Sequence, residues 1–210
     1  MAKRLADAQA RLGMTSRVVS SIDSTLYEAP FRHPLHTLAA VVDQHLVKRR
    51  DFAAPVSLYR NRLHRRLDRD LAGDDVLHIH WPHGLVDVDN LDKLARGRPV
   101  VWTLHDMAAL TGGCHYSLGC SCHRSGTGNC SGVRVPWQGA ITRARRSLSN
   151  SLHRVKRLRL VSPSQWLADE ATKSEGLGDL PIDVIPNPLA SATPATMVPD
   201  SARADLALPS

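Results

Sequence analysis

The sequence lacks any long apolar run, and it has few aromatic side chains. No segment of its 210 residues approaches the roughly 18 consecutive apolar residues that a membrane-spanning helix requires, and residues 1–16 lack the apolar core of a signal peptide. Its two phenylalanines, three tyrosines and four tryptophans are spread out, without the interleaving of basic and aromatic residues that typifies nucleic-acid stacking surfaces. These absences favour a cytoplasmic protein.

Acidic side chains are fewer than basic ones, since the sequence has 20 aspartates and glutamates and 27 lysines and arginines. The formal net charge of +7 favours anionic partners such as nucleic acid, phospholipid headgroups or nucleotide diphosphates. Two arginine-rich segments, residues 60–69 and 143–159, hold much of this charge. Such runs are usually hydrated helix faces, but these two could also hold the chain peripherally against an anionic membrane.

The hydrophobic pattern predicts an α/β protein. Apolar residues at helical spacing ahead of Gly13 predict a helix over residues 2–12, and a β-branched run follows at 16–22. Leucines recur at roughly helical spacing among arginines, and this pattern predicts a cationic amphipathic helix over residues 58–71. Four further β-rich runs alternate with segments that could hold helices, at residues 75–81, 98–106, 157–164 and 181–188. We therefore expect a mostly parallel sheet with flanking helices.

Polar side chains stand where each of these four runs ends. Because parallel strands end at a common carboxyl edge, we expect a binding site there, and its candidate residues are His80, His83, His105, Asp106, Ser162, Ser164 and Asn187. Each also has a structural interpretation. A histidine at a strand end is often only hydrogen-bonded, either serine could be the N-cap of a helix, and residues 185–188 could be a rigid exit from the sheet.

Taken together, these segments resemble a known family. The motifs "DVLHIHWPHG", "RPVVWTLHDMAALTGGCHY", "GCSCHRSGTGNC", "VSPSQWLADEA" and "DVIPNPL" resemble, in order and spacing, the N-terminal domain of glycosyltransferase family 4 enzymes, and most of all the bacterial exopolysaccharide, colanic-acid-type subgroup. The resemblance implies the Rossmann-like N-terminal domain of a GT-B fold over residues 1–188, with a cysteine-rich loop at 112–132. Residues 189–210 would be a linker toward an absent C-terminal donor-binding domain, and the family's first strand would also be missing.

The resemblance also implies a function, namely retaining transfer of a sugar from a nucleotide-sugar donor to a glycan or lipid-linked acceptor in cell-surface polysaccharide biosynthesis. No cofactor would be required. His105 would be the catalytic residue, with Asp106 orienting it or capping the next helix, and His80, His83, Ser162, Ser164 and Asn187 would bind substrate. We expect the protein in the cytoplasm or at the inner face of the cell membrane, and we expect this chain to be truncated and inactive. The alternative is a basic, cysteine-containing nucleic-acid-binding or interaction module without catalysis.

The four cysteines, Cys114, Cys120, Cys122 and Cys130, are clustered in sequence. In a cytoplasmic protein such a cluster favours a metal site or free thiols over a disulfide framework. A structural zinc bound by four thiolates, or by three together with His115 or His123, would hold this glycine-rich loop. The spacing is not that of a standard zinc ribbon, so free thiols and redox-formed disulfides remain alternatives.

Overall fold

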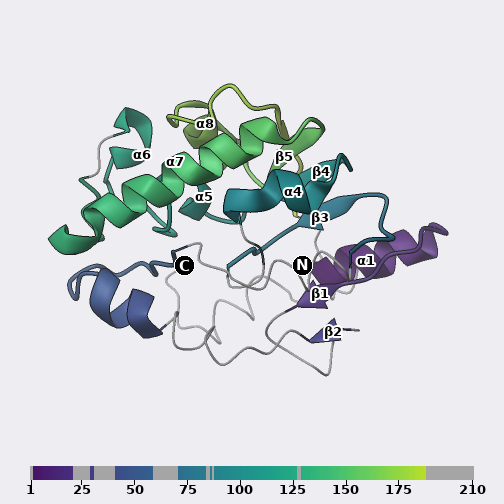
Figure 1. Cartoon of the computed structure of the whole chain (residues 1–210), viewed down its shortest axis with the longest axis horizontal. Helices are drawn as coiled ribbons and strands as arrows, with labels where there is room; N and C mark the ends of the chain where they lie inside the picture. Colours follow the sequence, from purple (N-terminus) through teal and green to yellow (C-terminus); the bar gives the residue numbers. More distant parts are fainter. Residues whose placement is uncertain are drawn as a thin grey trace, which may run out of the picture.

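The computed structural model describes residues 2–20, 29–30, 41–58, 71–83, 86, 88–126 and 129–187. Its helices and strands are labelled in Figure 1. They are α1 (Ala2–Arg11), β1 (Val19–Ser20), β2 (Ala29–Pro30), η1 (Asp43–Val47), β3 (Leu77–Ile79), η2 (Val88–Asn90), α4 (Leu91–Ala95), β4 (Val100–Thr103), α5 (Ala108–Thr111), α6 (Cys122–Ser125), η3 (Val135–Trp137), α7 (Gln138–Arg154), β5 (Leu158–Ser162), α8 (Gln165–Thr172) and β6 (Ile182–Val184). The predicted α/β class is confirmed.

A four-stranded parallel sheet, in the order β3-β4-β5-β6, forms the centre of the domain. Each strand lies within one of the four β-rich runs found in the sequence, although it is shorter than its run. The register aligns Leu77 with Val100, and Val100 with Leu158. Because all four strands run in the same direction, their carboxyl ends share one edge, as the sequence pattern predicted.

The N-terminal strands do not belong to this sheet, although Val19 packs against its core. Helix α1 confirms the predicted opening helix, and Gly13 follows it with a φ of +80°, the left-handed conformation expected of a glycine after a helix. Strand β1 confirms the β-branched run, but it pairs in parallel with β2 in a separate two-stranded sheet. The predicted cationic helix over 58–71 falls largely on residues 59–70, outside the described residues.

Helix α7 crosses one side of the sheet beside α4 (Figure 1). Its buried residues are Ile141, Arg145, Leu148, Ser151 and Leu152, a spacing of three and four that places them on one face of the helix. The Ser151 hydroxyl accepts a hydrogen bond of 3.0 Å from the backbone N–H of Leu91, in the first turn of α4. One helix thus both covers the core and satisfies a free donor at the end of its neighbour.

A second, smaller hydrophobic cluster lies at the end of α7 where Ile141 is buried. It joins Val47, Phe52 and Val56 from residues 47–58 to three cysteines of the 112–132 loop. Short antiparallel bridges, Lys48 with Val133 and Val56 with Cys114, connect the same segments. None of the described helices combines the length and the apolar character that a membrane span requires.

Candidate functional site at the carboxyl edge of the sheet

A small pocket opens where β3 and β4 end. Its lining comes from the residues that follow these two strands and from the start of α5, namely His80, Trp81, Pro82, His83, Trp102, Thr103, Leu104, His105, Asp106 and Ala109. Four of the residues predicted from the sequence are therefore brought together: His80, His83, His105 and Asp106. Backbone pairing of β3 with β4 explains this, since it sets the two strand ends side by side.

Two histidines face each other across this edge. The Nδ1 atom of His80 lies 2.9 Å from the Nε2 atom of His105, a hydrogen bond in which one ring donates and the other accepts. The ring of His80 also stacks on that of His78, with centroids 4.3 Å apart, and His78 Nε2 lies 2.8 Å from the Thr103 hydroxyl oxygen. Ring stacking and hydrogen bonds thus fix the orientation of the pair.

The environment favours neutral imidazoles. Burial, with smaller contributions from His78 and His105, lowers the pKa of His80 to about 3. Burial likewise lowers the pKa of His105, although the nearby Asp106 carboxylate opposes the shift, and it lowers the pKa of His78. Neutral rings can each donate and accept a hydrogen bond, so this edge can bind hydroxyl groups or phosphate oxygens without carrying a fixed charge.

Asp106 makes two contacts that position the loop. Its Oδ1 accepts a hydrogen bond of 2.8 Å from the backbone N–H of Ala108, at the start of α5. Its Oδ2 lies 2.9 Å from Nδ1 of His115, whose Nε2 lies 2.9 Å from the Ser57 hydroxyl oxygen. Asp106 thus holds the first backbone N–H of α5 and the ring of His115 by hydrogen bonds, and its predicted catalytic role stays a prediction.

Sequence reasoning did not select Trp81 as a site residue. Its side chain is 48% exposed at the mouth of the pocket, and its ring lies 5.4 Å from that of His83 and 5.0 Å from that of His115. A tryptophan directly after the "HIH" strand, at the expected edge, was the available signal. A large, partly exposed aromatic face of this kind can stack on the apolar face of a ring-shaped ligand.

The other predicted site residues do not line this pocket. Ser162 is buried, and its hydroxyl donates to the Ser164 carbonyl at 2.8 Å. The Ser164 hydroxyl caps α8 by accepting from the backbone N–H of Leu167 at 3.3 Å, as the structural interpretation of this segment proposed. Asn187 is exposed beyond β6. Substrate contacts of these three residues stay predictions.

The cysteines gather inside the second hydrophobic cluster. The sulfur atoms of Cys120, Cys122 and Cys130 lie within 4.8 Å of one another, and Cys114 Sγ lies 2.9 Å from Cys130 Sγ. All four are free thiols. Hydrogen bonds from the Cys114 and Cys122 thiols lower the pKa of Cys130 to about 3, and the same contacts together with burial raise the pKa values of those two donors.

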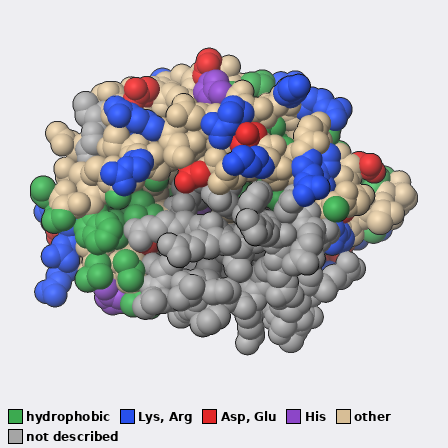
Figure 2. All heavy atoms as spheres, in the orientation of Figure 1, with side chains coloured by type: hydrophobic (Ala, Val, Ile, Leu, Met, Phe, Trp, Pro, Cys, Tyr) green, Lys and Arg blue, Asp and Glu red, His purple; other side chains and the backbone are tan. Residues whose placement is uncertain are grey.

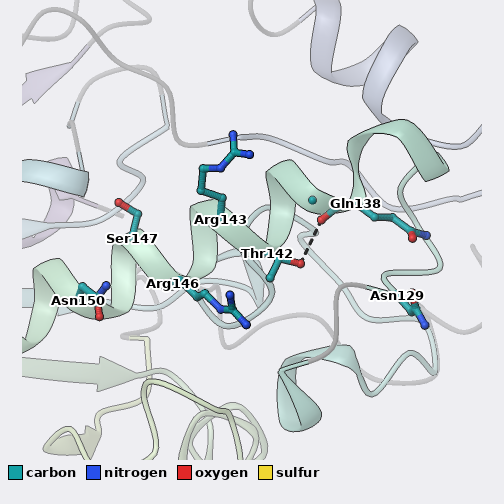
Figure 3. A pocket seen from close by; sticks show the side chains of 8 residues that line it. Asn129, Gln138, Thr142, Arg143, Arg146, Ser147 and Asn150 are labelled. Carbon is teal, nitrogen blue, oxygen red and sulfur yellow. Dashed lines mark hydrogen bonds between the residues drawn. The ribbon is translucent and has the colours of Figure 1, made fainter.

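Several arginines of the segment 143–159 are engaged within the protein. Arg145 is buried and donates to the Cys122 carbonyl, and Arg154 pairs with Asp92 at 3.0 Å. Arg143 and Arg146 are exposed and form no ion pair with any residue that the structure describes. Both line a shallow polar groove along α7 (Figure 3), together with Asn129, Gln138, Gly139, Thr142, Ser147 and Asn150. Over the face drawn in Figure 2, basic side chains alternate with acidic ones. The other segment, 60–69, lies outside the described residues.

Comparison with known proteins agrees with this architecture. The family model described as Glycosyltransferase Family 4 matches residues 1–191. A protein of Escherichia coli strain K12, named as the colanic acid biosynthesis glycosyl transferase WcaC, is 29% identical over 131 residues, which cover 56% of this chain and 32% of that relative. The match thus spans about a third of the relative's length. No solved structure matches.

Proposed function

The chain belongs to glycosyltransferase family 4, and from this premise we propose that it forms the acceptor-side domain of a sugar-transferring enzyme. The donor is a nucleotide sugar, and the acceptor is a glycan or a lipid-linked glycan in cell-surface polysaccharide biosynthesis. The likeness to a relative named for colanic acid biosynthesis supports this acceptor class. The parallel sheet with helices on its sides is consistent with the Rossmann-like domain of a GT-B enzyme.

The observation that carries the proposal is the hydrogen-bonded pair His80 and His105 at the carboxyl edge, beside the exposed ring of Trp81. Sugar hydroxyls need partners that both donate and accept, and two neutral imidazoles provide them. The indole face offers an apolar surface for the C–H face of a pyranose ring. A pocket that combines these groups therefore suits a carbohydrate.

The transfer proceeds with retention of the anomeric configuration. The acceptor oxygen attacks the anomeric carbon on the face from which the nucleotide diphosphate leaves, and the acceptor proton passes to the departing phosphate oxygen. His105 hydrogen-bonds the donor sugar or the leaving phosphate and stabilises the charge that develops there. His80 and Asp106 are positioning residues, because His80 contacts the ring of His105 and Asp106 anchors the start of α5. No cofactor takes part in this reaction.

The enzyme works at the inner face of the cell membrane when its acceptor is lipid-linked. Arg143 and Arg146, exposed along the α7 groove (Figure 3), would contact anionic headgroups. Each arginine near such a surface contributes about 1 kcal/mol. Since Arg154 and Arg159 already face Asp92 and Asp183 at 3.0 and 3.4 Å, their charges contribute less.

The decisive experiment is a transfer assay on the native gene product that contains this chain. Nucleotide diphosphate release is measured with a panel of nucleotide sugars, with and without lipid-linked acceptors, and the anomeric configuration of the product is read by NMR. We expect acceptor-dependent release, retention, and a loss of about 100-fold or more in turnover for His105→Ala. The matched control is His45→Ala, an exposed histidine of η1. Absence of acceptor-dependent release with every donor would contradict the proposal.

A further inference from the structure

Three of the four cysteines in the 112–132 loop, namely Cys120, Cys122 and Cys130, lie close enough together to hold a metal ion. Three sulfur atoms lie within 4.8 Å of one another, and the fourth, Cys114 Sγ, is 2.9 Å from Cys130 Sγ. In a tetrahedral site with Zn–S bonds of about 2.3 Å, neighbouring sulfurs stand about 3.8 Å apart. The 2.9 Å between the sulfurs of Cys114 and Cys130 exceeds the roughly 2.05 Å of a disulfide. Cys114 lies outside the group of three close sulfurs, so coordination by all four requires its side chain to move.

The two histidines of the loop, His115 and His123, form hydrogen bonds with residues other than the cysteines. Both ring nitrogens of His115 have partners, Asp106 and Ser57, at 2.9 Å each. The Nε2 atom of His123 lies 2.9 Å from Glu170, and its buried Nδ1 has no hydrogen-bond partner among the described residues. Neither belongs to the described group of side chains that could share one ion, which consists of Cys120, Cys122 and Cys130. The remaining candidate for a fourth ligand is therefore Cys114, which is 1% exposed and contacts Cys130.

We propose that Cys114, Cys120, Cys122 and Cys130 bind one structural Zn²⁺ as four thiolates. Zinc suits this set because thiolate is a soft ligand and a closed set of four sulfurs leaves no open position for chemistry. The site would not take part in sugar transfer. Binding releases the thiol protons, so the bound cluster carries a net charge of −2.

Surrounding groups would stabilise that charge and hold the ligands. The buried guanidinium of Arg145 donates to the Cys122 carbonyl at 2.7 Å, and so places a positive charge beside a ligand residue. Such outer contacts orient the ligands of metal sites.

The proposed site would join three separated parts of the chain. Cys114 bridges to Val56 in the segment 47–58, Cys122 begins α6, and Cys130 precedes the bridge between Val133 and Lys48. Because His115 follows Cys114 directly, fixing Cys114 also limits the movement of His115 and of its partner Asp106 in the pocket. The zinc, although it would lie outside the pocket, would thus limit the movement of the side of the candidate substrate site that contains Asp106.

Metal content of the reduced, purified 210-residue chain tests the proposal directly. We expect about one zinc per chain by elemental analysis. Replacing zinc by Co²⁺ should produce the intense near-ultraviolet sulfur-to-cobalt charge transfer and the visible bands of a tetrahedral thiolate site. Chelation should lower the unfolding temperature and accelerate tryptic cleavage after Arg124 within α6.

Variants assign the ligands. Each of the four Cys→Ser changes should lower the zinc that survives dialysis against a chelator by about tenfold or more, whereas Ser121→Ala, exposed between two ligands, should leave it at the wild-type level. If a serine variant fails to fold, the cobalt spectrum of the wild-type chain still decides the question. No bound metal and no charge-transfer band would overturn the proposal, and so would iron in place of zinc or a Cys114–Cys130 disulfide in the intact mass. None of these measurements depends on sugar transfer.

Discussion

His80 and His105 form a hydrogen bond of 2.9 Å between Nδ1 and Nε2, although 25 positions separate them in the chain. Each follows the end of a strand, and the parallel pairing of β3 with β4 places the two ends side by side. Their rings are also stacked, with centroids 5.2 Å apart and planes inclined by 23°. The pairing of the two strands thus brings the rings together, and removing either ring should change the environment of the other.

The free energy of unfolding should fall as the pH is lowered from 6.5 to about 3. In this range His80 is protonated in the unfolded chain but stays neutral in the folded protein. The pKa of His80 is lowered from 6.5 to about 3 in the folded protein, so between these values the unfolded state binds more protons and unfolding is favoured. His80→Gln should flatten the slope of unfolding free energy against pH over this range. Urea titrations at several pH values measure it, with His45→Gln as the control, and parallel slopes in all three proteins would contradict the prediction.

Glu170 should be an important anchor of α6. Its carboxylate lies 2.9 Å from His123 Nε2 and 2.6 Å from an Arg124 nitrogen, and the hydrogen bond from Arg124, assisted by His123, lowers the pKa of Glu170 to about 2. Glu170→Gln should cost about 1–3 kcal/mol at neutral pH, and the difference from wild type should shrink as the pH falls from about 4.5 toward 2. Denaturant unfolding measures both effects.

The exposed pair between Lys3 and Asp7 provides the control for Glu170. These side chains are about half exposed and lie four positions apart on α1, at 3.1 Å. Asp7→Asn should therefore change the free energy of unfolding by no more than about 0.5 kcal/mol. A cost for Glu170→Gln as small as that for Asp7→Asn would show that the buried carboxylate does not anchor the loop.

Gly112 and Gly119 have nearly the same backbone conformation but different surroundings. Their φ values are +86° and +88°, yet a Cβ on Gly112 would lie 2.5 Å from the Ile141 carbonyl oxygen of α7, whereas one on Gly119 would meet nothing within 4 Å. Both Gly→Ala changes carry the strain of a left-handed backbone, roughly 1–2 kcal/mol. Gly112→Ala should cost about 1–3 kcal/mol more, because it also pushes α5 away from α7. Equal losses in thermal unfolding would contradict this account.

Membrane association should depend on the exposed arginines of α7. We expect binding to vesicles to rise with anionic lipid and to fall with salt, and Arg143→Gln with Arg146→Gln to weaken it by about fivefold for each arginine. Arg154→Gln is the matched control on the same helix, since Asp92 already neutralises that side chain. Cosedimentation measures the effect. Binding that is independent of both lipid charge and salt would rule the contact out.

The sequence was sufficient to predict the sheet and the edge at which its strands end. Short runs rich in β-forming residues between helical segments are a local property of the sequence, and each of the four runs contains an observed strand. The approach of His80 to His105 follows from the same rule, because strands that run in one direction end at one edge. The cap at Ser164 was also foreseeable, since an N-cap is a contact between residues three positions apart.

Other features depended on contacts between distant segments, which no local pattern specifies. Asp106 holds His115 rather than His105 because residues 106 and 115 are brought together with Ser57, which is 58 positions from His115. Arg145 belongs by composition to a basic surface run, yet it is buried, because its place on α7 faces α6 and the Cys122 carbonyl. The sequence determined which residue types are present and in which segments the strands lie. The tertiary structure decided which hydrogen-bond partner each polar side chain meets, because burial leaves it only the partners that packing supplies.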